Sequence, residues 1–205
     1  MFRKSSNKTV IALISIFFVI GLANGGCALT KDSVNLEYIS QKNVAKVSGA
    51  DKVTVTVSLE DIRTIKDKVS SKKNGYGMEM AAIVSNNDVA ELVKGAITEE
   101  LQNRGFKVNN DGVIIGIELT KFYNDFKIGM WSGSAAGEVA FNVQVKKADG
   151  NIVYAKSITG LDTQKGIQLC SGKNAKAALD GALNDAIAKL MDDESFIEAI
   201  LKVGS

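Results

Sequence analysis

The chain has 205 residues, 45% of them hydrophobic and 23% charged, and it contains neither histidine nor proline. The 25 basic and 23 acidic residues nearly balance, which argues against a basic patch for nucleic acid. Without histidine the chain lacks the usual general base at neutral pH, the commonest transition-metal ligand and the middle member of most hydrolytic triads. These absences exclude most familiar enzyme designs and favour a globular protein with no metal or other cofactor.

The N-terminal segment has the three-part layout of a secretion signal. Basic residues within the first eight positions precede an apolar run from Val10 to Ala23, and small residues follow up to Gly26. The run is about 14 residues long, whereas a transmembrane helix needs roughly 20. We therefore predict that residues 1–26 are a cleaved signal peptide. Its removal leaves 22 basic and 23 acidic residues, a net charge of −1.

Cys27 follows this segment directly, and the sequence NGGC resembles the lipobox of bacterial lipoproteins, in which the cysteine is acylated and becomes the first residue after cleavage. Several acyl chains hold a protein firmly, because each buried CH₂ contributes about 0.8 kcal/mol. Asn24 departs from the pattern, which prefers an aliphatic residue three positions before the cysteine. A cut after Gly25 would instead release a soluble protein in which Cys27 and Cys170 could form a disulfide. We predict lipidation, a tether over residues 27–32, and Cys170 as a small core residue.

Residues 33–205 are predicted to form a single domain. Its first part contains three segments with the alternating apolar pattern of half-buried strands, at residues 33–40, 52–63 and 78–84. A helix is predicted over residues 87–104. Ser85 and Asp88 supply its start signal, and the glycine that follows Arg104 supplies its stop.

The middle of the domain is predicted to be extended, with strands at residues 105–108, 113–126, 138–147 and 152–160. The apolar stretch at 113–117 predicts a central strand buried on both faces. A loop rich in glycine and serine, residues 127–137, carries Met130 and Trp131. The Asp149-Gly150 pair predicts a tight hairpin turn.

Two helices are predicted to close the chain, at residues 174–191 and 195–201. Ser195 and Glu198 have the spacing of a capping box for the second helix. Runs of strands with helices between and after them predict an α+β fold. We expect a mostly antiparallel sheet of about five or six strands, covered on one face by the middle helix and the C-terminal helix pair.

The DIR motif at residues 61–63 and the stretch KKNGYGMEMAAIVSNNDVAELVKGAITEELQNRGFKV at residues 72–108 resemble the YajG-like family of bacterial lipoproteins. The late hairpin and the C-terminal helices continue the likeness, which covers nearly the whole mature chain. Ala82 departs from the family, where proline is frequent. The resemblance implies a lipoprotein of the outer membrane that faces the periplasm, and Ala28 agrees with this because aspartate at that position is the usual inner-membrane signal. It names no substrate.

Two sets of charged residues are interpreted as structural. Arg63 and Asp61 are expected to form a salt bridge across the sheet or to hold the turn at residues 72–77, with a ligand contact as the alternative. Acidic pairs near the predicted helix ends are interpreted as solvated surface charge: Glu99, Glu100, Asp192 and Asp193.

Asn74, Gly75, Tyr76 and Gly77 predict a turn. The glycines permit positive φ, and Tyr76 is expected to cap the core with its hydroxyl in water. A phosphate-binding glycine loop would open directly into a helix, whereas here an extended segment intervenes. The turn is therefore interpreted as backbone structure rather than as a phosphate site.

Met130 and Trp131 are the best candidates for contact with a partner, because aromatic residues dominate interface hot spots. The alternative is that Trp131 folds back and plugs the end of the sheet. The preferred hypothesis is a non-catalytic interaction module that is held at the membrane by its lipid and docks on an envelope protein, through the Trp131 loop or an open sheet face.

Two other functions remain open at this point. A carrier or sensor of an apolar ligand would use room beside the small residues of the late helix, Ala178, Ala182 and Ala186. An enzyme would need two carboxylates facing each other across a cleft, the arrangement that cleaves sugars.

Overall fold

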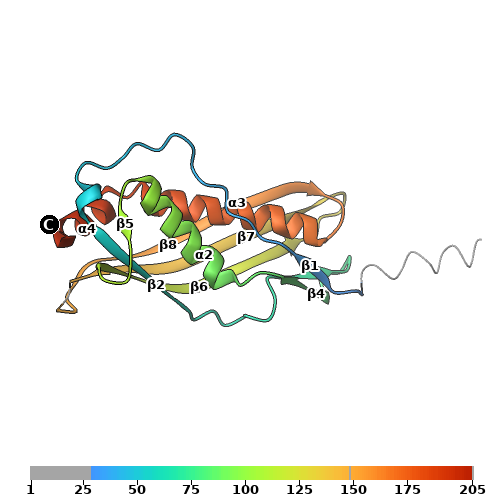
Figure 1. The fold of residues 1–205 in the computed structure, drawn as a ribbon. Helices are drawn as coiled ribbons and strands as arrows, with labels where there is room; N and C mark the ends of the chain where they lie inside the picture. Colours follow the sequence, from blue (N-terminus) through green and yellow to red (C-terminus); the bar gives the residue numbers. More distant parts are fainter. Residues whose placement is uncertain (1–28, 148, 205) are drawn as a thin grey trace, which may run out of the picture.

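Helices cover one face of a twisted β-sheet in the computed structural model, which describes residues 29–147 and 149–204 (Figure 1). Within this part of the chain the sheet has eight strands, and a connected hydrophobic core lies between the sheet and the helices. The fold is α+β, as the sequence predicts. The predicted signal peptide and Cys27 lie outside the described residues.

The element order contains one strand that the sequence patterns miss. The strands are β1 (Asp32–Val34), β2 (Thr54–Asp61), β3 (Ser70–Lys73), β4 (Glu79–Ser85), β5 (Lys107–Val108), β6 (Val113–Lys127), β7 (Gly133–Lys146) and β8 (Ile152–Ile167). The helices are the short 3-10 helix η1 (Ala50–Lys52), α2 (Val89–Asn103), α3 (Gly172–Met191) and α4 (Glu194–Gly204). Strand β3 was not predicted because its sequence, SSKK, has no apolar alternation. Strand β7 begins inside the expected loop.

The sheet is mixed, so the expectation of a mostly antiparallel sheet with five or six strands is wrong. Its order is β1-β4-β3-β6-β2-β5, and β7 pairs with β6 and β8. Strand β6 runs parallel to β2 and β3 and antiparallel to β7. Helix α2 lies in the long connection from β2 to its parallel neighbour β6, and parallel neighbours require such a crossover. Apolar alternation reveals which face of a strand is buried, but it does not reveal the direction of the neighbouring strand.

Strand β6 occupies the centre of the sheet and is buried on one face. Its buried side chains are Val113, Ile115, Ile117, Leu119, Phe122, Asn124 and Phe126. A β-bulge between Leu119 and Lys121 shifts the alternation by one residue and returns Phe122 to the core side. On the opposite face, Ile114 is 40% exposed. The predicted burial of residues 113–117 on both faces is therefore wrong. The helices of the described chain cover only the face that carries Val113, Ile115 and Ile117, and they leave the face with Ile114 uncovered.

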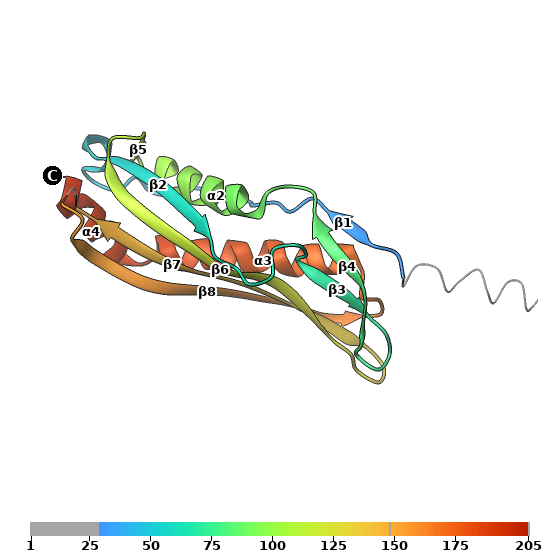
Figure 2. The ribbon, with the colours of Figure 1, turned by 90° about the horizontal axis from the view of Figure 1, so that it is seen from below.

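Helix α3 packs closely along β7 and β8 because glycines on these strands face it (Figure 2). A Cβ atom on Gly137 would lie 2.2 Å from the carbonyl oxygen of Ala178, and one on Gly160 would lie 2.1 Å from that of Ala182. Ala178, Ala182 and Ala186 are fully buried. These small residues allow helix backbone to approach strand backbone. The room that the carrier hypothesis places beside these alanines is filled.

The predicted strand at residues 33–40 is shorter in the structure. Strand β1 ends at Val34, and the chain then follows the start of α2. The backbone N–H of Leu36 donates to Oδ1 of Asn87 (3.0 Å), and Nδ2 of Asn87 donates to the carbonyl oxygen of Leu36 (3.0 Å). The carboxamide of Asn87 thus satisfies the backbone N–H and carbonyl groups of Leu36, as a neighbouring strand would do.

The carboxylate of Glu100 is fully buried and ties this N-terminal segment to α2, so its interpretation as solvated surface charge is wrong. It accepts hydrogen bonds from Tyr38 Oη (2.8 Å), Ser40 Oγ (3.0 Å), Gln41 N (2.8 Å) and Arg104 Nη1 (2.5 Å). Burial by itself would raise the pKa of Glu100, but these hydrogen bonds outweigh burial and lower the pKa below its ordinary value.

Aspartates begin both α2 and α4, and at α4 the sequence suggested a serine instead. Oδ1 of Asp88 accepts from the backbone N–H groups of Ala90 (2.8 Å) and Glu91 (3.1 Å). At α4, Oδ1 of Asp193 accepts from the backbone N–H of Ser195 (3.0 Å). Asp193 thus takes the role that the predicted capping box gives to Ser195.

Candidate functional site: an apolar end of the sheet

Large apolar side chains gather at the end of the sheet where β3 joins β4, β6 joins β7 and β8 joins α3. Tyr76 and Met130 are each 91% exposed, and Trp131 is 88% exposed. We call this surface the apolar end, and its exposed members are Tyr76, Met78, Ile128, Met130, Trp131 and Leu169. Exposed apolar clusters mark sites of contact with proteins or membranes.

The β3–β4 turn holds Tyr76 at the tip of its hairpin. Oδ1 of Asn74 accepts from the backbone N–H groups of Tyr76 (3.0 Å) and Met78 (3.1 Å), and Gly77 has a φ of +81°. A Cβ on Gly75 would meet no atom within 4 Å, so the turn stands clear of the rest of the protein. Backbone groups and one carboxamide therefore close the turn. Tyr76 points into solvent, and the expectation that it caps the core is wrong.

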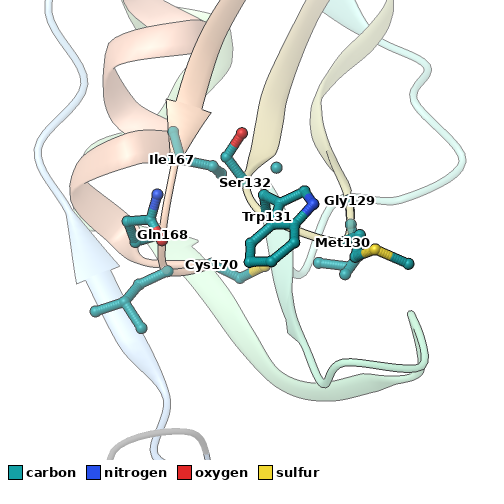
Figure 3. Close-up of a pocket in the computed structure, with 10 residues that line it drawn as sticks. Gly129, Met130, Trp131, Ser132, Ile167, Gln168 and Cys170 are labelled. Atoms are coloured by element: carbon teal, nitrogen blue, oxygen red, sulfur yellow. The ribbon is translucent and has the colours of Figure 1, made fainter.

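The β6–β7 connection, residues 128–132, presents Met130 and Trp131 outside the core (Figure 3). A Cβ on Gly129 would lie 2.2 Å from the carbonyl oxygen of Ser132, so the connection is a tight turn that requires glycine. A hollow of about 230 Å³ lies between this turn and residues 167–170, and Trp131 and Cys170 line it from the two sides. The exposure of Trp131 excludes the alternative in which it plugs the end of the sheet.

Polar contacts hold the connections of this end together and join them to the N-terminal strand. Lys73, at the end of β3, pairs with Asp125 of β6 (2.5 Å). Asp32 of β1 pairs with Lys72 of β3 (2.8 Å) and accepts a hydrogen bond from the backbone N–H of Gly172 at the start of α3 (2.9 Å). Strand β1 therefore starts at the apolar end.

Arg63 and Asp61 form a local pair at the end of β2. Nε and Nη2 of Arg63 donate to the two carboxylate oxygens of Asp61 at 2.9 and 2.8 Å. These hydrogen bonds hold the pKa of Asp61 below its ordinary value. The pair neither crosses the sheet nor reaches the turn at residues 72–77, so both structural expectations for it are wrong.

A hollow of about 240 Å³ separates Arg63 from the start of α2. Nη1 of Arg63 is buried and has no hydrogen-bond partner among the described residues. A helix N-terminus next to an arginine resembles an anion site. Here, however, Asp88 already accepts hydrogen bonds from the first free N–H groups of α2 and brings its own negative charge. We therefore assign Arg63 a structural role.

Glu60 and Glu118 come nearest to the carboxylate pair that the enzyme hypothesis requires. They are register neighbours on β2 and β6 and line a hollow of about 270 Å³ on the uncovered face of the sheet, together with Lys146. Both carboxylates project from the same face of the sheet. A glycosidase site needs two carboxylates that face each other across a cleft. The described residues contain no group of three acidic, cysteine or histidine residues that could hold a metal ion.

Of the two cysteines, only Cys170 lies within the described part of the chain. Cys170 is half-buried at the apolar end, where it packs against the edge of the core, and it forms no disulfide with another described residue. The lipidation predicted at Cys27, and its alternative disulfide with Cys170, involve a residue outside the described part of the chain.

Residues 40–201 match the model of a family described as uncharacterized lipoprotein, and the chain belongs to this family. Membership indicates a membrane-anchored lipoprotein of the bacterial envelope. No curated protein matches the chain. Within the described residues, no helix combines the length and the hydropathy needed to span a membrane.

One solved structure supports the fold, and two others are less similar to it. A Xanthomonas campestris protein of the DUF330 family aligns with a TM-score of 0.54 and 12% identity, over 84% of this chain and 96% of that chain. A minor lipoprotein from Acinetobacter baumannii aligns with a TM-score of 0.46 and 7% identity, over 72% and 95% of the two chains. A putative neuraminyllactose-binding hemagglutinin homolog from Helicobacter pylori reaches a TM-score of 0.41 and 5% identity, over 83% and 96%. Only the first of these likenesses supports the fold.

Sequence reasoning identified Met130 and Trp131 but missed the rest of the apolar end. Ile128, Leu169 and the Tyr76–Met78 turn lie in separate stretches, and the pairing of strands brings them to one place. A usable signal was present, because each of these large apolar residues lies in a turn or next to one.

Proposed function

We infer that the protein is a lipid-anchored, non-catalytic interaction module of the bacterial envelope, held to the outer membrane through Cys27 and facing the periplasm. Membership in a lipoprotein family supports the anchor, and the resemblance of residues 61–108 to YajG-like lipoproteins supports the outer membrane. The contact surface of the module is the apolar end.

The observation that carries this proposal is the exposure of Met130 and Trp131 on a tight turn, beside the exposed hairpin tip at Tyr76. Large apolar side chains in water are unfavourable by roughly 25 cal/mol per Å² relative to a buried state. A protein that gathers them on short connections, while its core is filled, gains from covering them. A contact role explains this arrangement, whereas the chain's own packing does not need it.

A photoreactive residue in place of Met130, in the full-length protein in intact cells, tests the proposal. The matched control position is Ile39, which is 65% exposed and lies beside the later half of α3, where its backbone N–H donates to Asn184. We expect light-dependent adducts with an envelope component at position 130 and few at position 39. Equal labelling at both positions, or none at position 130, would refute an interaction role for this surface.

A further inference from the structure

We propose that the apolar end lies in the headgroup region of the same bilayer that holds the lipid anchor, so that its partner is a phospholipid surface. The inference rests on the proposed function and names the partner of its contact surface. Three features carry it: the path of the chain from the anchor, the kinds of side chain that are exposed, and the charge that surrounds them.

The predicted anchor is only a short length of chain away from strand β1, which starts near the apolar end. Leu29 is 64% exposed and follows Cys27 by two residues, a span of at most about 7 Å between Cα atoms. Asp32 is held by Lys72 of β3 and by the start of α3. It follows Cys27 by five positions, which allows at most about 18 Å between the two Cα atoms. Acyl chains on Cys27 would therefore bring the bilayer surface to this end of the sheet and to no other.

The exposed side chains are those that favour a membrane interface. Tyr76 and Trp131 combine an apolar ring with a polar group, and such rings concentrate at the level of the lipid headgroups. Met78, Ile128, Met130 and Leu169 add flexible or branched apolar groups around them. Short turns can enter this region because their backbone polar groups stay within reach of water and headgroups, about 5–10 Å deep.

The charge around the apolar end is positive. Three acidic residues beside it are neutralised by a lysine, in the pairs Asp32–Lys72, Glu79–Lys68 and Asp125–Lys73. Asp162 on β8 accepts a hydrogen bond from Gln164 and forms no salt bridge with a described residue. Four further lysines of this end are exposed and form no salt bridge with a described residue: Lys31, Lys127, Lys165 and Lys173. A basic rim around apolar side chains suits anionic phospholipids, because each lysine near such a surface adds attraction of about 1 kcal/mol.

This orientation leaves the uncovered sheet face free. Strands β6, β7 and β8 span the distance between the apolar end and the far end of the molecule, so the sheet would extend from the bilayer into the periplasm (Figure 2). The envelope protein expected as a partner would then meet the open face of the sheet.

Trp131 reports on this contact directly, because it is the one tryptophan of the chain. The lipidated protein is placed in vesicles of phosphatidylethanolamine and phosphatidylglycerol that carry bromine at defined acyl positions. We expect Trp131 emission to shift to shorter wavelength. Bromines near the headgroup should quench it about twofold more than bromines at the chain end, because interfacial side chains lie about 5–10 Å deep.

Matched variants separate insertion from simple proximity. Met130→Asp should abolish most of the quenching, whereas Ile39→Asp, an equally polar change at an exposed apolar residue outside the apolar end, should leave it unchanged. Lys127→Glu should reduce quenching in vesicles that contain phosphatidylglycerol, and Lys107→Glu, on β5 at the other end of the sheet, should not. Retained melting temperatures show that the variants are folded.

The outcomes distinguish this inference from the function on which it rests. Unquenched Trp131 together with a protein adduct from position 130 in cells would overturn bilayer contact and leave the interaction module standing. Unquenched Trp131 without any adduct would overturn both. Quenching that Met130→Asp leaves unchanged would also overturn the inference, because the turn would then not be inserted.

Discussion

The close packing of α3 on the sheet predicts that a single methyl group at Gly160 destabilises the protein. In Gly160→Ala the new Cβ would lie 2.1 Å from the carbonyl oxygen of Ala182, 2.4 Å from the backbone nitrogen of Ala186 and 2.6 Å from its Cβ. Ordinary contacts begin near 3.4 Å, so the overlap exceeds 1 Å. Two of the three obstructing atoms belong to helix backbone, and a change of side-chain rotamer cannot relieve the clash.

The expected cost follows from moving a helix. Overpacking a core costs about 1–3 kcal/mol, and we expect the upper end because α3 must shift away from β7 and β8 together. In a domain of this size each kcal/mol changes the melting temperature by about 2–4 °C. The melting temperature should therefore fall by about 6–12 °C in Gly160→Ala. Gly137→Ala should behave alike, because its Cβ would lie 2.2 Å from the carbonyl oxygen of Ala178.

Gly116→Ala is the matched control, because Gly116 lies on β6 and its Cβ would point to the uncovered face. The nearest atom is Ser58 Oγ at 4.0 Å. Removing a strand glycine at an open position should stabilise the protein by about 0.5 kcal/mol. Thermal and urea unfolding of the variants measure both effects. Equal stability of Gly160→Ala and Gly116→Ala would refute the close approach of α3 and would reopen the space that an apolar ligand needs.

Three further predictions concern the buried acid, the anchor and the apolar end. Glu100→Gln leaves Arg104 without its charge partner and should lower the free energy of unfolding by about 3 kcal/mol at pH 7. The folded-state pKa of Glu100 lies below its ordinary value of 4.5, so the charged form stabilises the protein above pH 4.5 and loses this effect as the pH falls through the lowered pKa. The difference in urea unfolding between Glu100→Gln and the unmodified chain should therefore shrink below pH 4.5, and a constant difference would contradict this account. Cys27→Ser should release the protein from membranes in cell fractionation; unchanged membrane association, or a disulfide between Cys27 and Cys170 in the mature protein, would reject the lipid anchor. Trp131→Ala should change the melting temperature by less than about 2 °C, because the side chain is 88% exposed, and a larger fall would place the indole in a packed environment.

The helices illustrate how far local patterns reach. The apolar spacing of residues 87–104 and 174–191 predicts α2 and α3 to within about two residues at each end, because a helix satisfies its backbone hydrogen bonds from its own chain. The strands against which these helices pack could not be predicted from the same patterns. The alanines of α3 indicate a helix with one face of small side chains. The sequence pattern does not show that this face packs against Gly137 and Gly160, which lie on strands distant in the sequence.

The burial of the charged Glu100 side chain could not be predicted from the sequence. Glu99 and Glu100 are neighbours of the same kind, and helical spacing alone gives no reason to bury one of them. Glu100 is buried because the segment at residues 38–41 crosses the end of α2 and supplies donors to its carboxylate. That crossing is a long-range contact, which residue spacing does not encode.

The sequence by itself predicted most strands and helices, because their patterns depend on residues close together in the chain, and it excluded histidine chemistry. The signal segment and the lipidated cysteine after it stay predictions from the sequence. Tertiary structure alone decided that the sheet is mixed and that Tyr76, Trp131 and Leu169 share one end with the first strand. Strand pairing brings these residues together, and the free energy of pairing depends on distant partners that no local pattern records.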